Sequence, residues 1–276
     1  MESSIQKVLF VNSEMLPYLP ETRIAKVSRE LAPGIQDRKH EIRSFMSRYG
    51  CINERKHQLH EVIRLSGMNL IISDVDRPLV IKVASISAAR MQVYFIDNDD
   101  YFSRRQTARS EDGTFFADND ERAIFYARGV LETVKKLRWA PDIIHCSGWI
   151  SHLLPVYLKK IYKDDPIFAG SRVVLSLYGD SGRDAFNPDF RKKVTGGNIA
   201  PEDLPFLENP TGIELAKTAV QYSDGVIFGS PDVDAELVGF CRQEGKKTLT
   251  CDESSFEDGR YISEYNDFYE KLFDEA

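Results

Sequence analysis

The sequence predicts an α/β fold: a Rossmann-like three-layer sandwich with a mainly parallel sheet and an added β-hairpin region. Short apolar runs with the composition of buried strands alternate with helical patterns in both halves of the chain. Parallel strands need such crossovers, which cover the faces of the sheet. Between residues 59 and 97 the pattern changes to short segments rich in Val, Ile and Tyr, which is typical of hairpins.

The first part of the chain reads as strand, helix and strand. Lys7–Asn12 is an apolar run, Ile24–Gln36 has helical spacing, and Glu41–Met46 is a second strand. Four more strand-like segments follow at Leu59–Leu65, Leu70–Ser73, Leu79–Ser85 and Gln92–Asp97. The residues SDVDRP have turn chemistry, and we expect them to join two of these strands in a hairpin.

The strongest helix signal covers Asn119–Trp139. Asp118 or Asn119 offers a cap, acidic residues fill the first turn, and basic residues followed by Pro141 end the helix. The alternation then resumes. We expect strands over Asp142–Cys146, Arg172–Leu177 and Asp224–Gly229, and helices over Ile150–Tyr162, Ile213–Tyr222 and Asp232–Glu244.

These elements predict a Rossmann-type domain over residues 1–245 and a C-terminal tail over residues 246–276. Ile262–Phe273 carries apolar residues at helical spacing, so we expect a terminal helix that docks on the same domain. The sequence shows no internal repeat and no low-complexity linker.

Composition excludes several classes of function. The 276 residues are 42% hydrophobic and 29% charged, as in ordinary globular proteins. The net charge of −7 argues against a broad nucleic-acid surface, which needs clustered Lys and Arg. The apolar run Val8–Val11 is too short for a signal peptide, and no stretch approaches the length of a membrane span. The four cysteines form no CxxC pair, so we expect reduced thiols and a cytoplasmic location.

Several motifs, in order, make the chain resemble the bacterial glycogen synthases and plant starch synthases. The opening KVLFVNSEMLPY, the segment VYFIDNDDYFSRR, the long DNDERAIFYARGVLETVKKLRWAPDIIHCSGW and the later YSDGVIFGSP all resemble that family. The resemblance covers about Lys7 to Glu236 and implies one half of a GT-B glycosyltransferase fold. It also implies the family reaction, transfer of glucose from ADP-glucose to an α-1,4-glucan with retention at the anomeric carbon.

The first departure from the family lies in the loop after the first strand. The family reads Lys-Thr-Gly-Gly-Leu-Ala-Asp there, whereas residues 20–26 read PETRIAK. Both glycines and the lysine are lost, so the side chains of Thr22 and Arg23 fill space that a ligand needs. Glu21 adds a negative charge where the resemblance implies a phosphate nearby.

The second departure lies in HCSGW, where the family has His-Asp-Trp. Ser147 replaces the histidine near the reacting sugar, Gly148 replaces the aspartate, and Trp149 is kept. Loss of such a group costs ~10²–10⁴-fold in rate. The resemblance therefore leaves no catalytic residue. It implies a degenerate substrate-binding cleft, whose positions are Glu14, Tyr101, Ser147 and Trp149.

The third departure is length, because the chain ends about where the second, donor-binding domain of the family begins. We expect a glycogen or starch synthase-like domain that is inactive as an isolated chain. The alternative is a non-catalytic glucan-binding or partner-binding protein derived from the glycosyltransferase fold, that is, a pseudoenzyme; the resemblance implies a role in glycogen biosynthesis. The expected ligands are an α-glucan or a nucleotide sugar, without nucleic acid or membrane, and a homodimer or separate partner could cover the face freed by the second domain.

Other chemistries fit less well. No G-x-G-x-x-G follows the first strand, which argues against a dinucleotide-dependent dehydrogenase, and no cofactor is expected. The motif YGDSG at Tyr178–Gly182 lacks the second glycine of a nucleophile elbow, since Arg183 stands there. His57 and His60, three residues apart on a predicted strand, do not match a metal-binding helix, so no metal site is predicted.

Overall fold

The computed structural model describes residues 5–104 and 106–275. Its strands are β1 (Lys7–Asn12), β2 (Glu41–Ser47), β3 (His60–Glu61), β4 (Met68–Ile72), β5 (Val75–Ile86), β6 (Met91–Asp97), β7 (Ile143–Ser147), β8 (Arg172–Leu177), β9 (Gly225–Phe228) and β10 (Lys247–Thr250). The sheet has the order β10-β9-β8-β7-β1-β2-β6-β5-β3, and β4 pairs with β5. The strands from β10 to β6 are parallel, and β3, β4 and β5 pair antiparallel.

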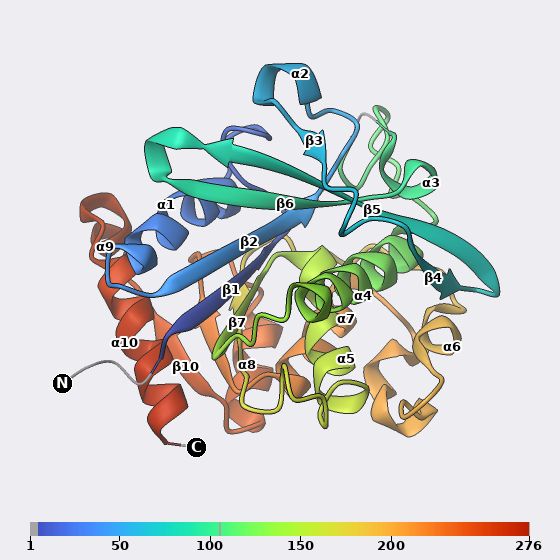
Figure 1. The fold of residues 1–276 in the computed structure, drawn as a ribbon. Helices are drawn as coiled ribbons and strands as arrows, with labels where there is room; N and C mark the ends of the chain where they lie inside the picture. Colours follow the sequence, from blue (N-terminus) through green and yellow to red (C-terminus); the bar gives the residue numbers. More distant parts are fainter. Residues whose placement is uncertain (1–4, 105, 276) are drawn as a thin grey trace.

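Helices cover the sheet on two sides (Figure 1). They are α1 (Arg23–Gln36), α2 (Glu54–His57), α3 (Asp99–Phe102), α4 (Asn119–Leu137), α5 (Leu154–Lys160), α6 (Phe190–Val194), α7 (Gly212–Tyr222), α8 (Ala235–Gln243), α9 (Glu253–Asp258) and α10 (Tyr261–Asp274). One face carries α1 and α10, which contact each other, and the other carries α4, α5 and α7. The predicted three-layer α/β fold with a mainly parallel sheet is confirmed.

The positions of the helices follow from the handedness of the crossovers. The chain moves from β1 through α1 to β2 in one direction along the sheet, and from β7 through α5 to β8 in the other. Because such crossovers are right-handed, helices on the two paths lie on opposite faces. All the crossover helices from β6 to β10 therefore lie on one face, and their strands need another cover on the second face.

The C-terminal helix α10 supplies that cover. Tyr261, Tyr265 and Tyr269 are one turn apart and buried, and their rings pack edge to face in sequence. Gly225 of β9 lies beneath α10, since a Cβ there would be 2.5 Å from Leu272. Gly34 similarly lets α1 approach Ile262, which a Cβ would meet at 2.6 Å. The helix predicted at Ile262–Phe273 is thus present, and the division of the chain at residue 245 stays a prediction.

Two predicted elements are wrong in detail. Only His60–Glu61 of the segment Leu59–Leu65 forms a strand, because a turn follows in which Leu65 and Ser66 donate to the carbonyl of Val62. The segment Ile150–Tyr162 contains a short 3₁₀ turn at Trp149–Ser151 and then α5, which begins at Leu154. Pro155 stands in the first turn of α5, where its missing N–H costs nothing.

The hairpin expected around SDVDRP is formed by β4 and β5. Its turn consists of Ser73 and Asp74 alone, both at positive φ, while the rest of the motif continues into β5. Pro78 has no N–H to donate to a neighbouring strand. It is tolerated because it lies in the part of β5 that forms the short hairpin with β4, where it pairs with Asn69. No sequence pattern indicates β10 or α9, whose residues are mostly polar.

Candidate functional site

The strand order reverses between β1 and β7. From this pair the chain progresses outward in both directions, to β2 on one side and to β8 on the other. Asn12, the last residue of β1, pairs with Ser147, the last residue of β7. In open α/β sheets the loops that follow such a switch point diverge, and ligands bind in the crevice that they leave. The candidate site is therefore the edge formed by the loops after β1, β7 and β8.

Three of the four predicted site residues come from this edge. Glu14 follows β1, Ser147 ends β7, and Trp149 begins the 3₁₀ turn after it. The backbone N–H of Ser13 donates to the carbonyl of Ser147 at 2.8 Å, which joins the two loops. Trp149 is half-buried and packs against the rings of Phe115 and Phe186, at centroid distances of 6.1 and 6.0 Å.

Gly148 fixes the geometry of this junction. Its φ is +85°, and a Cβ there would overlap the Ser13 Oγ and lie 3.3 Å from the Asp180 Oδ2. A side chain is therefore excluded both by the backbone conformation and by Ser13. An aspartate, which the resemblance implies at this position, cannot replace Gly148 unless Ser13 moves. The position of Ser13 therefore depends on the glycine at 148.

Asp180 is the residue of this edge that the sequence did not single out. Its Oδ2 accepts the backbone N–H of Trp149 at 2.8 Å, which fixes the start of the loop after β7. Burial raises the pKa of Asp180 to about 6, and the nearby charges of Glu14 and Asp232 add to the shift. Within the described residues, the buried Oδ1 of Asp180 and the hydroxyls of Ser13 and Ser181 have no hydrogen-bond partner. The motif YGDSG contains Asp180, and that pattern by itself indicates only an incomplete nucleophile elbow.

Glu14, like Asp180, has a pKa that burial raises. The hydroxyl of Thr22, which donates to the Glu14 Oε2, opposes the shift in this pKa. Two carboxyl groups with raised pKa values thus lie at one edge beside a tryptophan. Such a pair can accept hydrogen bonds from hydroxyl groups, and it repels an anion.

The loop that departs from the family pattern is closed by the C-terminal segment. Thr22 caps α1, since its Oγ1 accepts the backbone N–H of Ala25 at 3.0 Å. Arg23 donates two hydrogen bonds to Glu253 of α9, and its guanidinium lies 4.5 Å from the centroid of the Phe256 ring. A cavity of about 370 Å³ remains between α1 and α9, and its walls carry Glu21, Glu30, Glu253 and Glu257 among other residues.

Tyr101 lies elsewhere. It belongs to α3, after β6, and β2 separates β6 from β1 in the sheet. Its ring is 2% exposed and its hydroxyl donates to Glu121 at 2.7 Å. Burial and the Glu121 carboxylate both raise the pKa of that hydroxyl. The structure thus gives Tyr101 a packing role, and its contact with a ligand stays a prediction.

His145 faces the α10 side of β7, the same side as Ser147, whose Oγ lies 3.5 Å from the His145 Nε2. It is hydrogen-bonded to Tyr269 of α10 through Nδ1 at 2.7 Å and to the Ser176 hydroxyl through Nε2 at 2.6 Å. Burial lowers its pKa to about 3, so the ring is neutral. His145 therefore holds α10 and does not replace the histidine of the family. Cys146 is fully buried, and burial raises its pKa, as expected of a structural thiol.

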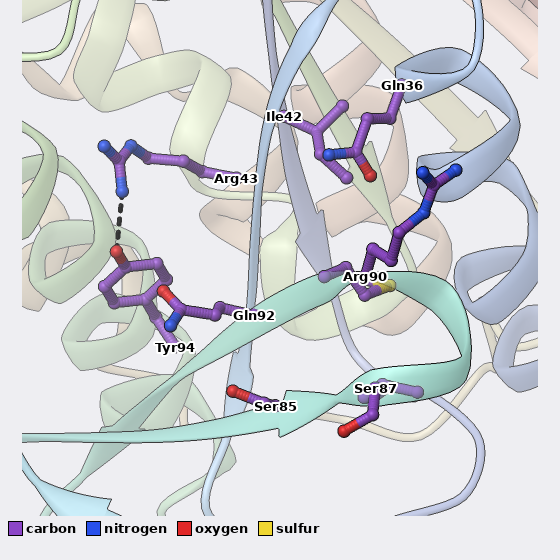
Figure 2. A pocket seen from close by; sticks show the side chains of 10 residues that line it. Gln36, Ile42, Arg43, Ser85, Ser87, Arg90, Gln92 and Tyr94 are labelled. Atoms are coloured by element: carbon purple, nitrogen blue, oxygen red, sulfur yellow. Dashed lines mark hydrogen bonds between the residues drawn. The ribbon is translucent and has the colours of Figure 1, made fainter.

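A second cavity lies at the other end of the strands. It has a volume of about 440 Å³ and opens beside the starts of β2 and β6 (Figure 2). Arg43 donates to the hydroxyl of Tyr94 at 2.6 Å, and in Figure 2 this pair lies on the other side of the strands from Gln36 and Arg90. Because β2 and β6 begin here, this cavity is remote from the carboxyl edge.

Two kinds of site find no support in the described ranges. Residues 5–104 and 106–275 contain no group of three or more His, Cys, Asp or Glu side chains that could hold a metal ion. None of their helices is both long and apolar enough to cross a membrane.

Comparisons with known proteins agree on one family. The family model described as the starch synthase catalytic domain matches residues 7–249. The glycogen synthase of Chlorobium luteolum is 35% identical over 173 residues, which cover 62% of this chain and 35% of that protein. The glycogen synthase of Chlorobaculum parvum is 30% identical over 233 residues, which cover 84% of this chain and 47% of that protein.

A solved structure shows the same fold. The catalytic domain of starch synthase IV from Arabidopsis thaliana, bound to ADP and acarbose, matches with a TM-score of 0.71 at 16% identity. The match covers 90% of this chain and 51% of that one. The chain thus spans between a third and a half of the length of these relatives.

Proposed function

The chain belongs to the starch synthase catalytic domain family, and from that premise we propose that it binds α-glucan at the carboxyl edge of β1 and β7 without itself transferring glucose from ADP-glucose. It is a glycogen and starch synthase-like glycosyltransferase domain, and the proposal concerns which part of the family's chemistry it keeps. The observation that carries the proposal is the closed start of α1, where Arg23 is held by Glu253 and Phe256.

The closed loop disfavours a nucleotide diphosphate. The start of a helix attracts anions through its free N–H groups, but here the Thr22 hydroxyl occupies one of them. The carboxyl groups of Glu14 and Glu21 lie at the same loop, and they would repel phosphate. Arg23, whose charge could offset them, is directed to Glu253. A diphosphate would have to displace α9 before it met these N–H groups.

The same edge suits a neutral sugar. The half-buried Glu14 carboxyl group can accept hydrogen bonds from sugar hydroxyls, whereas the buried Asp180 Oδ1 and the buried hydroxyls of Ser13 and Ser181 can do so only after the loops around them open. Trp149 provides an aromatic surface beside them. The related Arabidopsis thaliana structure was obtained with both ADP and acarbose, and we assign to this chain only the second kind of ligand.

A fluorescence titration tests the proposal directly. The chain has two tryptophans, Trp139 and Trp149, and Trp139 is buried near the start of β2, where its indole donates to Glu41. In a Trp139→Phe variant, Trp149 is therefore the only indole reporter. We expect maltohexaose to change its emission saturably and ADP-glucose to leave it unchanged. In the matched Trp149→Ala variant, calorimetric binding of maltohexaose should weaken by about tenfold, as loss of a stacking surface predicts.

Transfer is tested by incorporation of labelled glucose from ADP-glucose into glycogen. We expect no incorporation above a control without protein. Incorporation by the purified 276-residue chain would show that it is an active glucosyltransferase. Absence of saturable maltohexaose binding would refute the proposed glucan binding. A cytoplasmic location and a homodimer or separate partner both stay predictions.

A further inference from the structure

The sheet ends in a strand edge that is open. β10 pairs with β9 along its full length, and within the described residues no strand pairs with its other side. Lys247, Thr248 and Thr250 are exposed and Leu249 is half-buried. Such an edge presents free N–H and C=O groups that can pair with another chain.

A groove runs beside this edge, between β10 and α10. Its volume is about 440 Å³, and Leu249, Phe268 and Leu272 form its apolar lining. Asp267 and Lys271, one helical turn apart on α10, stand exposed at its rim. Among the described residues neither side chain is within salt-bridge distance of an opposite charge, although Lys247 and, less strongly, Lys271 lower the pKa of Glu275. The groove thus combines an open backbone edge, an apolar floor and two charges outside any salt bridge of the described chain.

The charges change sign along the groove. α10 runs antiparallel to β10, because Lys247 at the start of β10 pairs with Glu275 at the end of α10. At the other end, burial raises the pKa of the Cys251 thiol, after β10, and Glu264 near the start of α10 lies close enough to raise it further. Lys247, which is paired with Glu275, and Lys271 lie at one end, and Glu264, which lies 3.8 Å from Arg260, and Asp267 lie toward the other, so that Lys271 and Asp267 carry the difference in charge. A twofold rotation brings the positive end of one copy onto the negative end of a second copy.

We propose that this groove is a homodimer interface, in which β10 pairs antiparallel with β10 of a second copy and Lys271 of each chain faces Asp267 of the other. An isologous contact of this kind needs a self-complementary surface, which the sign change supplies. The interface extends the sheet across both copies and does not depend on what the carboxyl edge binds. The competing interpretation is an edge that its short length and Lys247 keep monomeric.

A charge-swap experiment decides between the two interpretations. Sedimentation equilibrium of the full chain should show a dimer. Lys271→Glu places two carboxylates opposite each other at both symmetry-related positions, and Asp267→Lys places two ammonium groups there. Each variant should dissociate at least about tenfold more readily, since like charges meet in the interface. Because both residues are exposed, circular dichroism should show an unchanged fold.

The decisive sample is an equal mixture of the two variants. In the mixed dimer the two substituted side chains face each other with opposite charges, and the unchanged Asp267 of one chain faces the unchanged Lys271 of the other. The mixture should therefore dimerise more strongly than either variant alone. The double variant Lys271→Glu with Asp267→Lys should do so as well. A wild-type chain that is monomeric at every concentration, a dimer that the single variants do not weaken, or a mixture that stays monomeric would each overturn the proposal.

Discussion

The two halves of the sheet differ in which helices cover their faces. In the half with β1, β2 and β6, crossover helices cover both faces, α1 on one and α4 on the other. In the half with β7 to β10, the crossover helices lie on one face, and α10 covers the second face from the far end of the chain. In the first half the helices that connect the strands cover both faces. In the second half one face is covered by α10, which lies far from those strands in the sequence.

This difference explains the closed loop at the site. Since α10 must lie beside α1, the segment that precedes it has to cross the carboxyl edge of the sheet. That segment is α9, and it meets the start of α1 through Arg23 and Glu253. The contact that closes the loop at residues 20–26 therefore accompanies the covering of β7 to β9 by α10.

The largest expected effect comes from removal of α10. A chain that ends at Gly259 loses the burial of five large side chains, namely Tyr261, Tyr265, Phe268, Tyr269 and Leu272. At ~1.5–3 kcal/mol for each side chain, the loss is comparable to the whole stability of a domain, ~5–15 kcal/mol. We expect no cooperative thermal transition. A truncated chain that melts like the full chain would show that the second half needs no cover.

The next effect tests the contact between the loops after β1 and β7, where the two halves of the sheet meet. Gly148→Ala should destabilise the chain by ~2–4 kcal/mol in urea unfolding, because the new Cβ meets Ser13 at a positive φ. Gly113→Ala is the matched control, since Gly113 has the same φ of +85° and no atom within 4 Å of the Cβ position. If Gly148→Ala and Gly113→Ala lowered the free energy of unfolding equally, the contact with Ser13 would contribute nothing beyond the cost of the positive φ.

The third effect concerns the edge of the second half. The pKa of Asp180 is raised from 3.8 to about 6, so the folded chain binds this proton more tightly than the unfolded chain does. The contribution to stability is therefore largest below about pH 4 and declines as the pH rises to about 6. Asp180→Asn should remove this decline, worth at most ~3 kcal/mol. We expect the variant to gain melting temperature relative to wild type at pH 7.5 but not at pH 4.5, and parallel profiles would contradict this.

The smallest effect tests the contact between the halves. Arg23→Gln removes an ion pair whose side chains are 29% and 53% exposed, so stability should fall by less than ~1 kcal/mol. Amide hydrogen exchange over residues 253–258 should nevertheless become faster, because α9 loses its anchor. Arg90→Gln, which removes the exposed pair with Asp37, is the control and should leave that exchange unchanged. Unchanged exchange in the first variant would mean that Phe256 alone holds α9.

Most of the fold was predictable because its elements have distinct patterns. The strand Arg172–Leu177 is an unbroken apolar run, and the helix at Asn119–Leu137 has charged ends that match its dipole. β10 was not predictable, because its residues KTLT contain one large apolar side chain and the strand is held by pairing with β9. The same holds for α9, whose buried face consists of Ser255 and Phe256.

The candidate site was predictable only in part. The resemblance led to Glu14, Ser147 and Trp149, which the structure does place at the carboxyl edge. It also led to Tyr101, which the structure buries against Glu121. Asp180 was missed, because its role depends on a hydrogen bond to the backbone of Trp149, and backbone partners leave no trace in side-chain motifs.

By itself, the sequence predicted the alternation of strands and helices and the family, and the resemblance to that family implied a changed loop at residues 20–26 and a serine in place of a histidine, because periodicity and motifs are local properties. Only the tertiary structure decided that α10 covers β7 to β9, that Arg23 is held by α9, and that Asp180 joins Glu14 at the site. The physical reason is that each of these depends on contacts between segments far apart in the chain. Crossover handedness and burial, which act only once the sheet has assembled, select those contacts.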